Sequence, residues 1–143
     1  NVSVSTPWAY GLCRQQRGGI YLSGENAFEL RRQALRQAPL LASLASGAPL
    51  PPLRNDLQAV VEPQVDSVRL ALSLLTSAGT PQLVAMSGSG PTCFALHDDV
   101  AAAKRAQVAL AERLETAGFE SWVCRFRRDG AGLEPQPAAG LPA

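Results

Sequence analysis

The sequence predicts an α+β fold, a split βαβ sandwich in which helices cover one face of a four-stranded antiparallel sheet. Two observations lead to this prediction. Four short segments have the apolar patterns of strands, and the segments between them have apolar residues at helical spacing. The elements follow in the order strand, several helices, strand, strand, helix, strand, which is the order of a split βαβ arrangement with an enlarged first crossover.

The first strand is predicted at residues 1–5, where Val2 and Val4 share one face. Thr6-Pro7 ends this strand, and proline suits the first turn of the short helix that follows. The next helix is predicted at residues 23–37 and is broken by Pro39. Asn55 is a favourable N-cap for a short helix that runs to Val61. The later elements are helices at 63–78 and 98–117, and strands at 82–86, 92–96 and 119–127.

Composition limits the possible functions. The net charge of +1 creates no strong field that would attract nucleic acid or an anionic membrane. The three cysteines are far apart and His97 is the single histidine, so we expect no Cys/His metal site and reduced thiols. The chain opens with Asn1 in a strand-like pattern, which we interpret as one domain, residues 1–128, of a longer protein. Residues 129–143 are rich in Gly, Pro and Ala and are predicted to be a disordered tail.

The most informative segment is the turn Ser87-Gly88-Ser89-Gly90 between two apolar runs. Glycine permits backbone angles that a side chain forbids, and it leaves backbone N–H groups open to close approach. Such N–H groups form a concave site for an anion, and the two serines add hydroxyl donors. A tight hairpin turn without any ligand is the alternative interpretation.

Three blocks of sequence together resemble the GHMP small-molecule kinases. They are residues 4–10 (Val-Ser-Thr-Pro-Trp-Ala-Tyr), Asn55-Asp56-Leu57, and residues 86–96 around the glycine turn. The third block is similar to the superfamily in general. The first resembles the branch that phosphorylates a diphosphocytidyl sugar alcohol in isoprenoid precursor biosynthesis. The resemblance covers about residues 1–126 and implies a C-terminal domain of the ferredoxin-like type.

The resemblance implies a role for each motif. Tyr10 would stack on the cytosine of the substrate, and Thr6 and Pro7 would belong to the same binding segment. The turn residues Ser87, Gly88, Ser89 and Gly90 would face the nucleotide phosphates or support the main phosphate loop. The alternatives are that Tyr10 packs the short helix and that Thr6 only ends a strand. Capping explains Asn55 without a function, and a network from Asp56 to the turn stays open.

The chain has no predicted catalytic residue of its own. It has no glycine-rich loop that opens a helix, and no Asp/Lys pair in a context that suggests a base. The resemblance implies that an N-terminal domain of the same protein supplies both, together with most of the site for ATP and Mg²⁺. We therefore expect half of an enzyme from a bacterial cytoplasm or a plastid stroma, with a small-molecule substrate and no nucleic-acid or membrane partner.

Three alternatives remain. The parent protein could be a GHMP kinase of the homoserine or mevalonate type, although Tyr10 after Thr6-Pro7 argues against this. A ferredoxin-like sandwich could also be a non-enzymatic ligand-binding module. An RNA-binding sandwich would need exposed aromatic residues on its central strands and a basic face, which the near-neutral charge does not favour.

Overall fold

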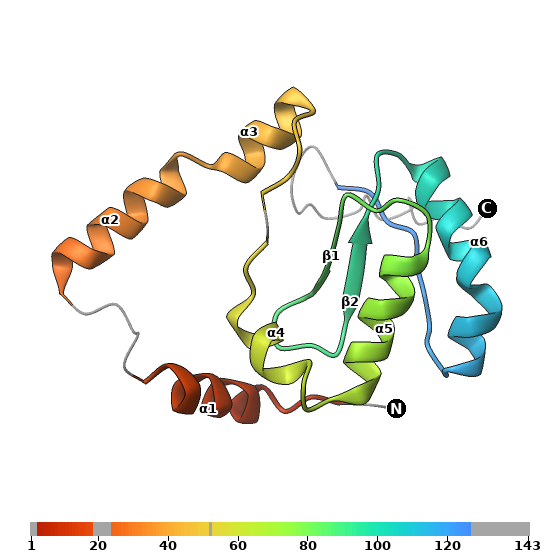
Figure 1. Cartoon of the computed structure of the whole chain (residues 1–143), viewed down its shortest axis with the longest axis horizontal. Helices are drawn as coiled ribbons and strands as arrows, with labels where there is room; N and C mark the ends of the chain where they lie inside the picture. The colour runs from red at the N-terminus through yellow and green to blue at the C-terminus, as the bar shows by residue number, and fades with distance from the viewer. Residues whose placement is uncertain (1–2, 19–23, 52, 127–143) are drawn as a thin grey trace, which may run out of the picture.

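The structure is a computed structural model that describes residues 3–18, 24–51 and 53–126. Figure 1 shows the order of its elements along the chain. They are α1 (Thr6–Arg17), α2 (Glu25–Arg36), α3 (Pro39–Ser46), α4 (Asp56–Val61), α5 (Asp66–Ser77), β1 (Leu83–Met86), β2 (Cys93–Leu96) and α6 (Val100–Thr116). No helix in these described ranges is both long and apolar enough to cross a bilayer.

The two strands form an antiparallel hairpin around the glycine turn. Leu83 is opposite Leu96 and Met86 is opposite Cys93. Helix α5 contacts both strands, and α6 packs beside α5. The strand bounds lie within one residue of the prediction, because the two short apolar runs and the turn between them are both local signals.

Helix α5 uses two sides to build the core. Val68 and Leu72 join a cluster with α1, α4 and the end of β1, whereas Leu74 packs with α6. The first cluster consists of Ala9, Cys13, Leu57, Val60, Val61, Val68, Leu72 and Met86. The second consists of Leu74, Ala78, Ala106, Leu110 and Leu114. The first cluster therefore fastens α1 and α4 to the strand that leads into the glycine turn.

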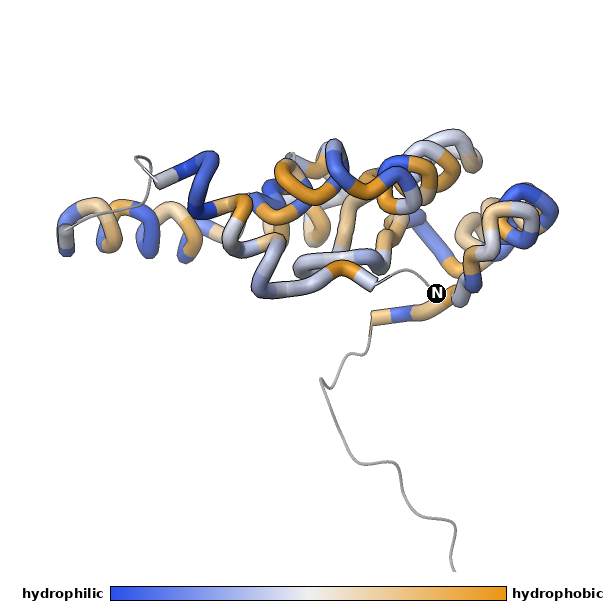
Figure 2. The backbone as a smooth tube through the Cα atoms, turned by 90° about the horizontal axis from the view of Figure 1, so that it is seen from below, coloured by the Kyte–Doolittle hydropathy of each residue, from blue (hydrophilic) through white to orange (hydrophobic). Residues whose placement is uncertain are grey.

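Helices α2 and α3 extend away from the hairpin as a separate arm (Figure 1) and contain no buried residue. Hydrophobic and hydrophilic residues alternate along α2 (Figure 2). Ion pairs of Glu29 with Arg32 and Arg36 span successive turns of α2 and stabilise it locally. The predicted break at Pro39 is confirmed, because Ala38 adopts φ 43° and α3 begins at the proline.

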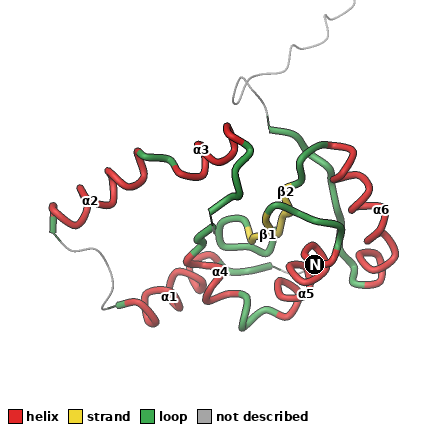
Figure 3. The backbone as a smooth tube through the Cα atoms, turned by 45° about the horizontal axis from the view of Figure 1, so that its top comes forward, coloured by secondary structure: helices red, strands yellow, loops and turns green. Residues whose placement is uncertain are grey.

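The described residues contain two of the four predicted strands. Residues 119–126 follow α6 as irregular chain (Figure 3). At its start, the amide of Phe119 donates to the Leu114 carbonyl and Gln107 Nε2 donates to Ser121. Residues 3–5 lead into α1, where the Ser5 hydroxyl accepts from the amide of Trp8. In a split βαβ sheet the first and last strands are neighbours. Residues 3–5 and 119–126 are not paired with each other, so each lacks the hydrogen-bond ladder that defines a strand.

Two further predictions need comment. Pro63 does not start α5, because the amides of Gln64 and Val65 both donate to the Val61 carbonyl and form a turn between α4 and α5. The helix begins three residues later, at Asp66. The predicted tail at 129–143 and the start of the first predicted strand lie outside the described residues. The α+β class is confirmed, and the part of the chain that the structure describes forms a two-stranded sheet rather than the predicted four-stranded one.

Candidate functional site

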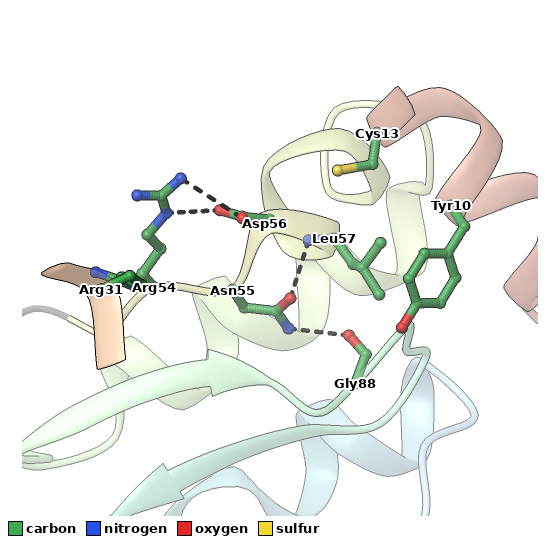
Figure 4. A pocket seen from close by; sticks show the side chains of 8 residues that line it. All are labelled: Tyr10, Cys13, Arg31, Arg54, Asn55, Asp56, Leu57 and Gly88. Carbon is green, nitrogen blue, oxygen red and sulfur yellow. Dashed lines mark hydrogen bonds and ion pairs between the residues drawn. The ribbon is translucent and has the colours of Figure 1, made fainter. Parts of the chain in front are cut away.

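A cavity of about 410 Å³ lies where four segments of the chain meet (Figure 4). Helix α1 contributes Tyr10 and Cys13, and α2 contributes Arg31. The start of α4 contributes residues 54–57, and the glycine turn contributes Gly88. The cavity therefore brings Tyr10 and one residue of the predicted phosphate turn to a single surface.

The two glycines of the turn are required for different reasons. Gly88 adopts φ 56° and a Cβ atom there would meet no heavy atom within 4 Å. Gly90 adopts φ 82°, and its Cβ would lie 2.7 Å from the sulfur of Met86. Both φ values fall in the left-handed region that favours glycine. Gly88 thus supplies backbone freedom beside open space, whereas Gly90 also supplies room for a core side chain.

Hydrogen bonds within the turn leave two donors available. The Ser87 amide donates to the Thr92 carbonyl at 2.8 Å, and the Gly90 amide donates to the Ser87 carbonyl at 2.9 Å. Among the described residues, no acceptor receives the amide hydrogens of Gly88 and Ser89. Two successive free N–H groups, the first on a glycine at φ 56°, are donors available to an anion.

Asn55 connects the start of α4 to this turn. Its Oδ1 accepts from the amides of Leu57 and Gln58 at 3.0 and 3.3 Å, so the predicted N-cap is confirmed. Its Nδ2 also donates to the carbonyls of Met86 and Gly88, at 2.8 and 2.9 Å. Capping alone is therefore an incomplete account of Asn55. Gln58 adds a third tie, because its Oε1 accepts from the Met86 amide at 2.8 Å.

Asp56 points to arginine side chains rather than to the turn (Figure 4). Arg54 Nε donates to Asp56 Oδ1 at 2.7 Å, and Arg17 forms a second ion pair with the same carboxylate. The hydrogen bond from Arg54, followed by the pair with Arg17, holds the pKa of the Asp56 carboxyl below its usual range. The network to the glycine turn that was considered for Asp56 is thus formed by its neighbour Asn55.

The structure places the predicted substrate segment next to the turn. Tyr10 is 59% exposed and points from α1 towards the turn (Figure 4), so it does not pack in the core. The Thr6 hydroxyl lies 2.9 Å from the Ser89 hydroxyl. Pro7 stands in the first turn of α1, and the exposed Trp8 does not line the cavity.

Several residues of the cavity were not expected from the sequence. Arg31 reaches it from α2, and Cys13 and Leu57 form part of its wall. No local motif marks these positions, because their place in the cavity depends on how α1, α2 and α4 are arranged. Within the described ranges, no group of three or more His, Cys, Asp and Glu side chains is placed to hold a metal ion.

Comparison with known proteins identifies the family. The sequence profile of the family described as "GHMP kinases C terminal" matches residues 31–116. A protein of Synechococcus sp. (strain CC9605), named 4-diphosphocytidyl-2-C-methyl-D-erythritol kinase, is 54% identical over 133 residues, which are 93% of this chain and 43% of the relative. Proteins with the same name from Prochlorococcus marinus (strain MIT 9313) and Synechococcus elongatus are 51% and 39% identical, each over 94% of this chain and 42% and 44% of the relative.

The chain therefore spans less than half the length of these curated relatives. No solved structure matches it significantly. The family profile covers more than half of the chain and includes Asn55, the glycine turn and both strands. The chain belongs to the family of GHMP kinase C-terminal domains.

Proposed function

We propose that this chain is the C-terminal, substrate-binding part of an ATP-dependent kinase. The parent protein would phosphorylate the 2-hydroxyl of 4-diphosphocytidyl-2-C-methyl-D-erythritol, a step in non-mevalonate isoprenoid precursor biosynthesis. The observation that carries this proposal is the contact of Thr6 with Ser89, which joins the segment Thr6-Pro7 to the glycine turn. Substrate and nucleotide phosphates must meet in a kinase, and here the two segments assigned to them touch.

Tyr10 would bind the cytosine ring. A pyrimidine that stacks on an aromatic side chain gains about 1–3 kcal/mol. The ring of Tyr10 is exposed at the cavity and therefore has a face available for stacking. Thr6 and Pro7 would shape the same segment, with the Thr6 hydroxyl near the methylerythritol or diphosphate part.

The glycine turn would serve the phosphates. The free amides of Gly88 and Ser89 offer two donors, and the hydroxyls of Ser87 and Ser89 offer two more. Gly90 would maintain the turn. The turn would either contact the phosphates directly or support the main phosphate loop of the N-terminal domain.

The remaining parts of the reaction would come from the rest of the protein. Phosphoryl transfer depends on Mg²⁺, on positioning and on electrostatic stabilisation. This chain offers oxygen and nitrogen donors for the reactants, but we assign no catalytic residue to it. An N-terminal domain of the same protein would hold ATP and Mg²⁺ and supply the base.

In the complete protein, the four-stranded sheet would form when residues 119–127 gain a neighbouring strand. We place this soluble kinase in a bacterial cytoplasm or a plastid stroma.

The test is an assay of the complete protein that contains this chain. Purified protein is incubated with ATP, Mg²⁺ and one of three alcohols: the diphosphocytidyl substrate, mevalonate or homoserine. Release of ADP with the first alcohol alone supports the proposal. Turnover with mevalonate or homoserine instead would assign another GHMP kinase, and no turnover with any of them would favour a ligand-binding module. Residues 1–143 alone should show no turnover.

A further inference from the structure

We infer that Asn55 is a positioning residue for the glycine turn, and that it aims the free amide of Ser89 away from α4. The inference deepens the proposed function, because it gives the phosphate-facing turn a specific source of orientation. It rests on two hydrogen bonds from one side chain to two carbonyls that flank Ser87, those of Met86 and Gly88.

The orientation of the Asn55 amide follows from its four partners. Two backbone N–H groups, of Leu57 and Gln58, require an acceptor, and two backbone carbonyls require a donor. Rotating the amide by 180° would place N–H against N–H and oxygen against oxygen. Asparagine therefore satisfies both sets at once, whereas aspartate would satisfy the cap and leave two carbonyl oxygens facing a carboxylate.

The planarity of the peptide bond links Asn55 to the Ser89 amide. In a trans peptide the C=O and N–H groups point in opposite directions. The peptide between Met86 and Ser87 shows this arrangement, since its carbonyl accepts from Asn55 and its amide donates to Thr92 on the other side. By the same geometry, a Gly88 carbonyl held by Asn55 directs the Ser89 amide away from α4.

The anchor itself is rigid. Leu57, Val60 and Val61 are buried in the first core cluster, so α4 cannot shift without opening the core. Gln58 strengthens the connection, because it accepts from the Met86 amide while Asn55 donates to the Met86 carbonyl. The glycine turn is consequently attached to α4, which limits the conformational freedom that its glycine-rich backbone would otherwise have.

The test compares Asn55→Asp with Asp99→Asn in the complete protein. Asp99 caps α6 through a 2.7 Å bond from the Ala102 amide, so its exchange alters a cap of similar chemistry away from the turn. Asn55→Ser is the second variant, because serine keeps a cap oxygen without placing a charge near the carbonyls. Each variant is measured for ATP and alcohol kinetics, for melting temperature, and for hydrogen exchange at the amides of Ser87 and Gly90.

We expect Asn55→Asp to lower kcat/KM for ATP by about 10- to 100-fold, as small misplacements of reacting groups do. KM for the alcohol should change less than twofold, and the Ser87 and Gly90 amides should exchange faster. Asn55→Ser should change the same quantities in the same direction, and Asp99→Asn should change none of them. If Asn55→Asp unfolds the protein, the result for Asn55→Ser decides whether Asn55 positions the glycine turn.

The inference is overturned if a folded Asn55→Asp variant leaves hydrogen exchange of the turn amides at the wild-type rate. Where Asn55→Asp does not fold, the same result for Asn55→Ser overturns it. It is also overturned if exchange rises while ATP and alcohol kinetics of an active protein stay unchanged. If the wild-type protein phosphorylates no alcohol, the proposed function fails. Exchange at Ser87 and Gly90 then decides separately whether Asn55 positions the turn.

Discussion

The hydroxyl oxygens of Thr6 and Ser89 lie 2.9 Å apart, although the residues are separated by 83 positions in the sequence. Thr6 is the first residue of α1, and Ser89 is in the glycine turn. The contact makes the position of the turn depend on the start of the helix that carries Tyr10. This relationship and the geometry around it lead to four predictions for the complete protein.

Thr6→Val and Ser89→Ala should affect kcat/KM for ATP non-additively. Each single change removes the same contact, so the double variant should lose less activity than the product of the two single losses. A hydrogen bond contributes about 0.5–1.5 kcal/mol, which corresponds to a coupling of about 2- to 10-fold. As a control, Thr116→Val alters a hydroxyl that bonds within α6 and should combine with Ser89→Ala additively. Additive effects for the first pair would show that the contact has no energetic role.

Tyr10→Ala should raise KM for the diphosphocytidyl substrate by about 5- to 100-fold, because stacking contributes about 1–3 kcal/mol. KM for ATP should change little. Tyr10→Phe should be nearly silent, since stacking uses the ring face. Trp8→Ala is the matched control on the same helix, because Trp8 does not line the cavity. Destabilisation by Tyr10→Ala with both KM values unchanged would make Tyr10 a structural residue.

Gly88→Ala and Gly90→Ala should have different consequences. Alanine in the left-handed region costs about 1–2 kcal/mol at either position. At Gly90 the added Cβ also collides with Met86, so that variant should lose more melting temperature. Gly88→Ala should lower kcat/KM for ATP more than Gly118→Ala, a control with φ 69° and no heavy atom within 4 Å of its Cβ. Equal activity of the Gly88 and Gly118 variants would favour a plain hairpin turn.

Cys93 should resist alkylation at neutral pH. Burial, with a contribution from Glu62, raises the pKa of the Cys93 thiol to about 11. A raised thiol pKa lowers the fraction of reactive thiolate at every pH below it, by about 100-fold at pH 8 for a rise of two units from 9. Iodoacetamide labelling followed by peptide mass spectrometry should show Cys124, which is exposed, reacting first. Labelling of Cys93 should accelerate as pH rises towards 11 or when urea unfolds the protein, and equal rates at pH 8 would contradict the prediction.

The sequence by itself determined the elements whose signals are local. Asn55 caps α4 as predicted, and Asp99 caps α6 at the predicted start of that helix, because an N-cap depends on a side chain and the backbone two or three residues ahead. The hairpin strands and the glycine turn were also predictable, since two apolar runs and the glycines between them lie within one short segment. The helix after Thr6-Pro7 follows from the same kind of local signal.

Only the tertiary structure decided what these elements bring together. The second pair of hydrogen bonds from Asn55, the contact of Thr6 with Ser89 and the place of Arg31 in the cavity all join segments that are far apart in the chain. The course of residues 119–126 was decided in the same way, because a strand forms only where a neighbouring backbone offers its hydrogen bonds. Local patterns determine which groups are available, whereas packing of the buried faces of α1, α4 and α5 determines which of them meet.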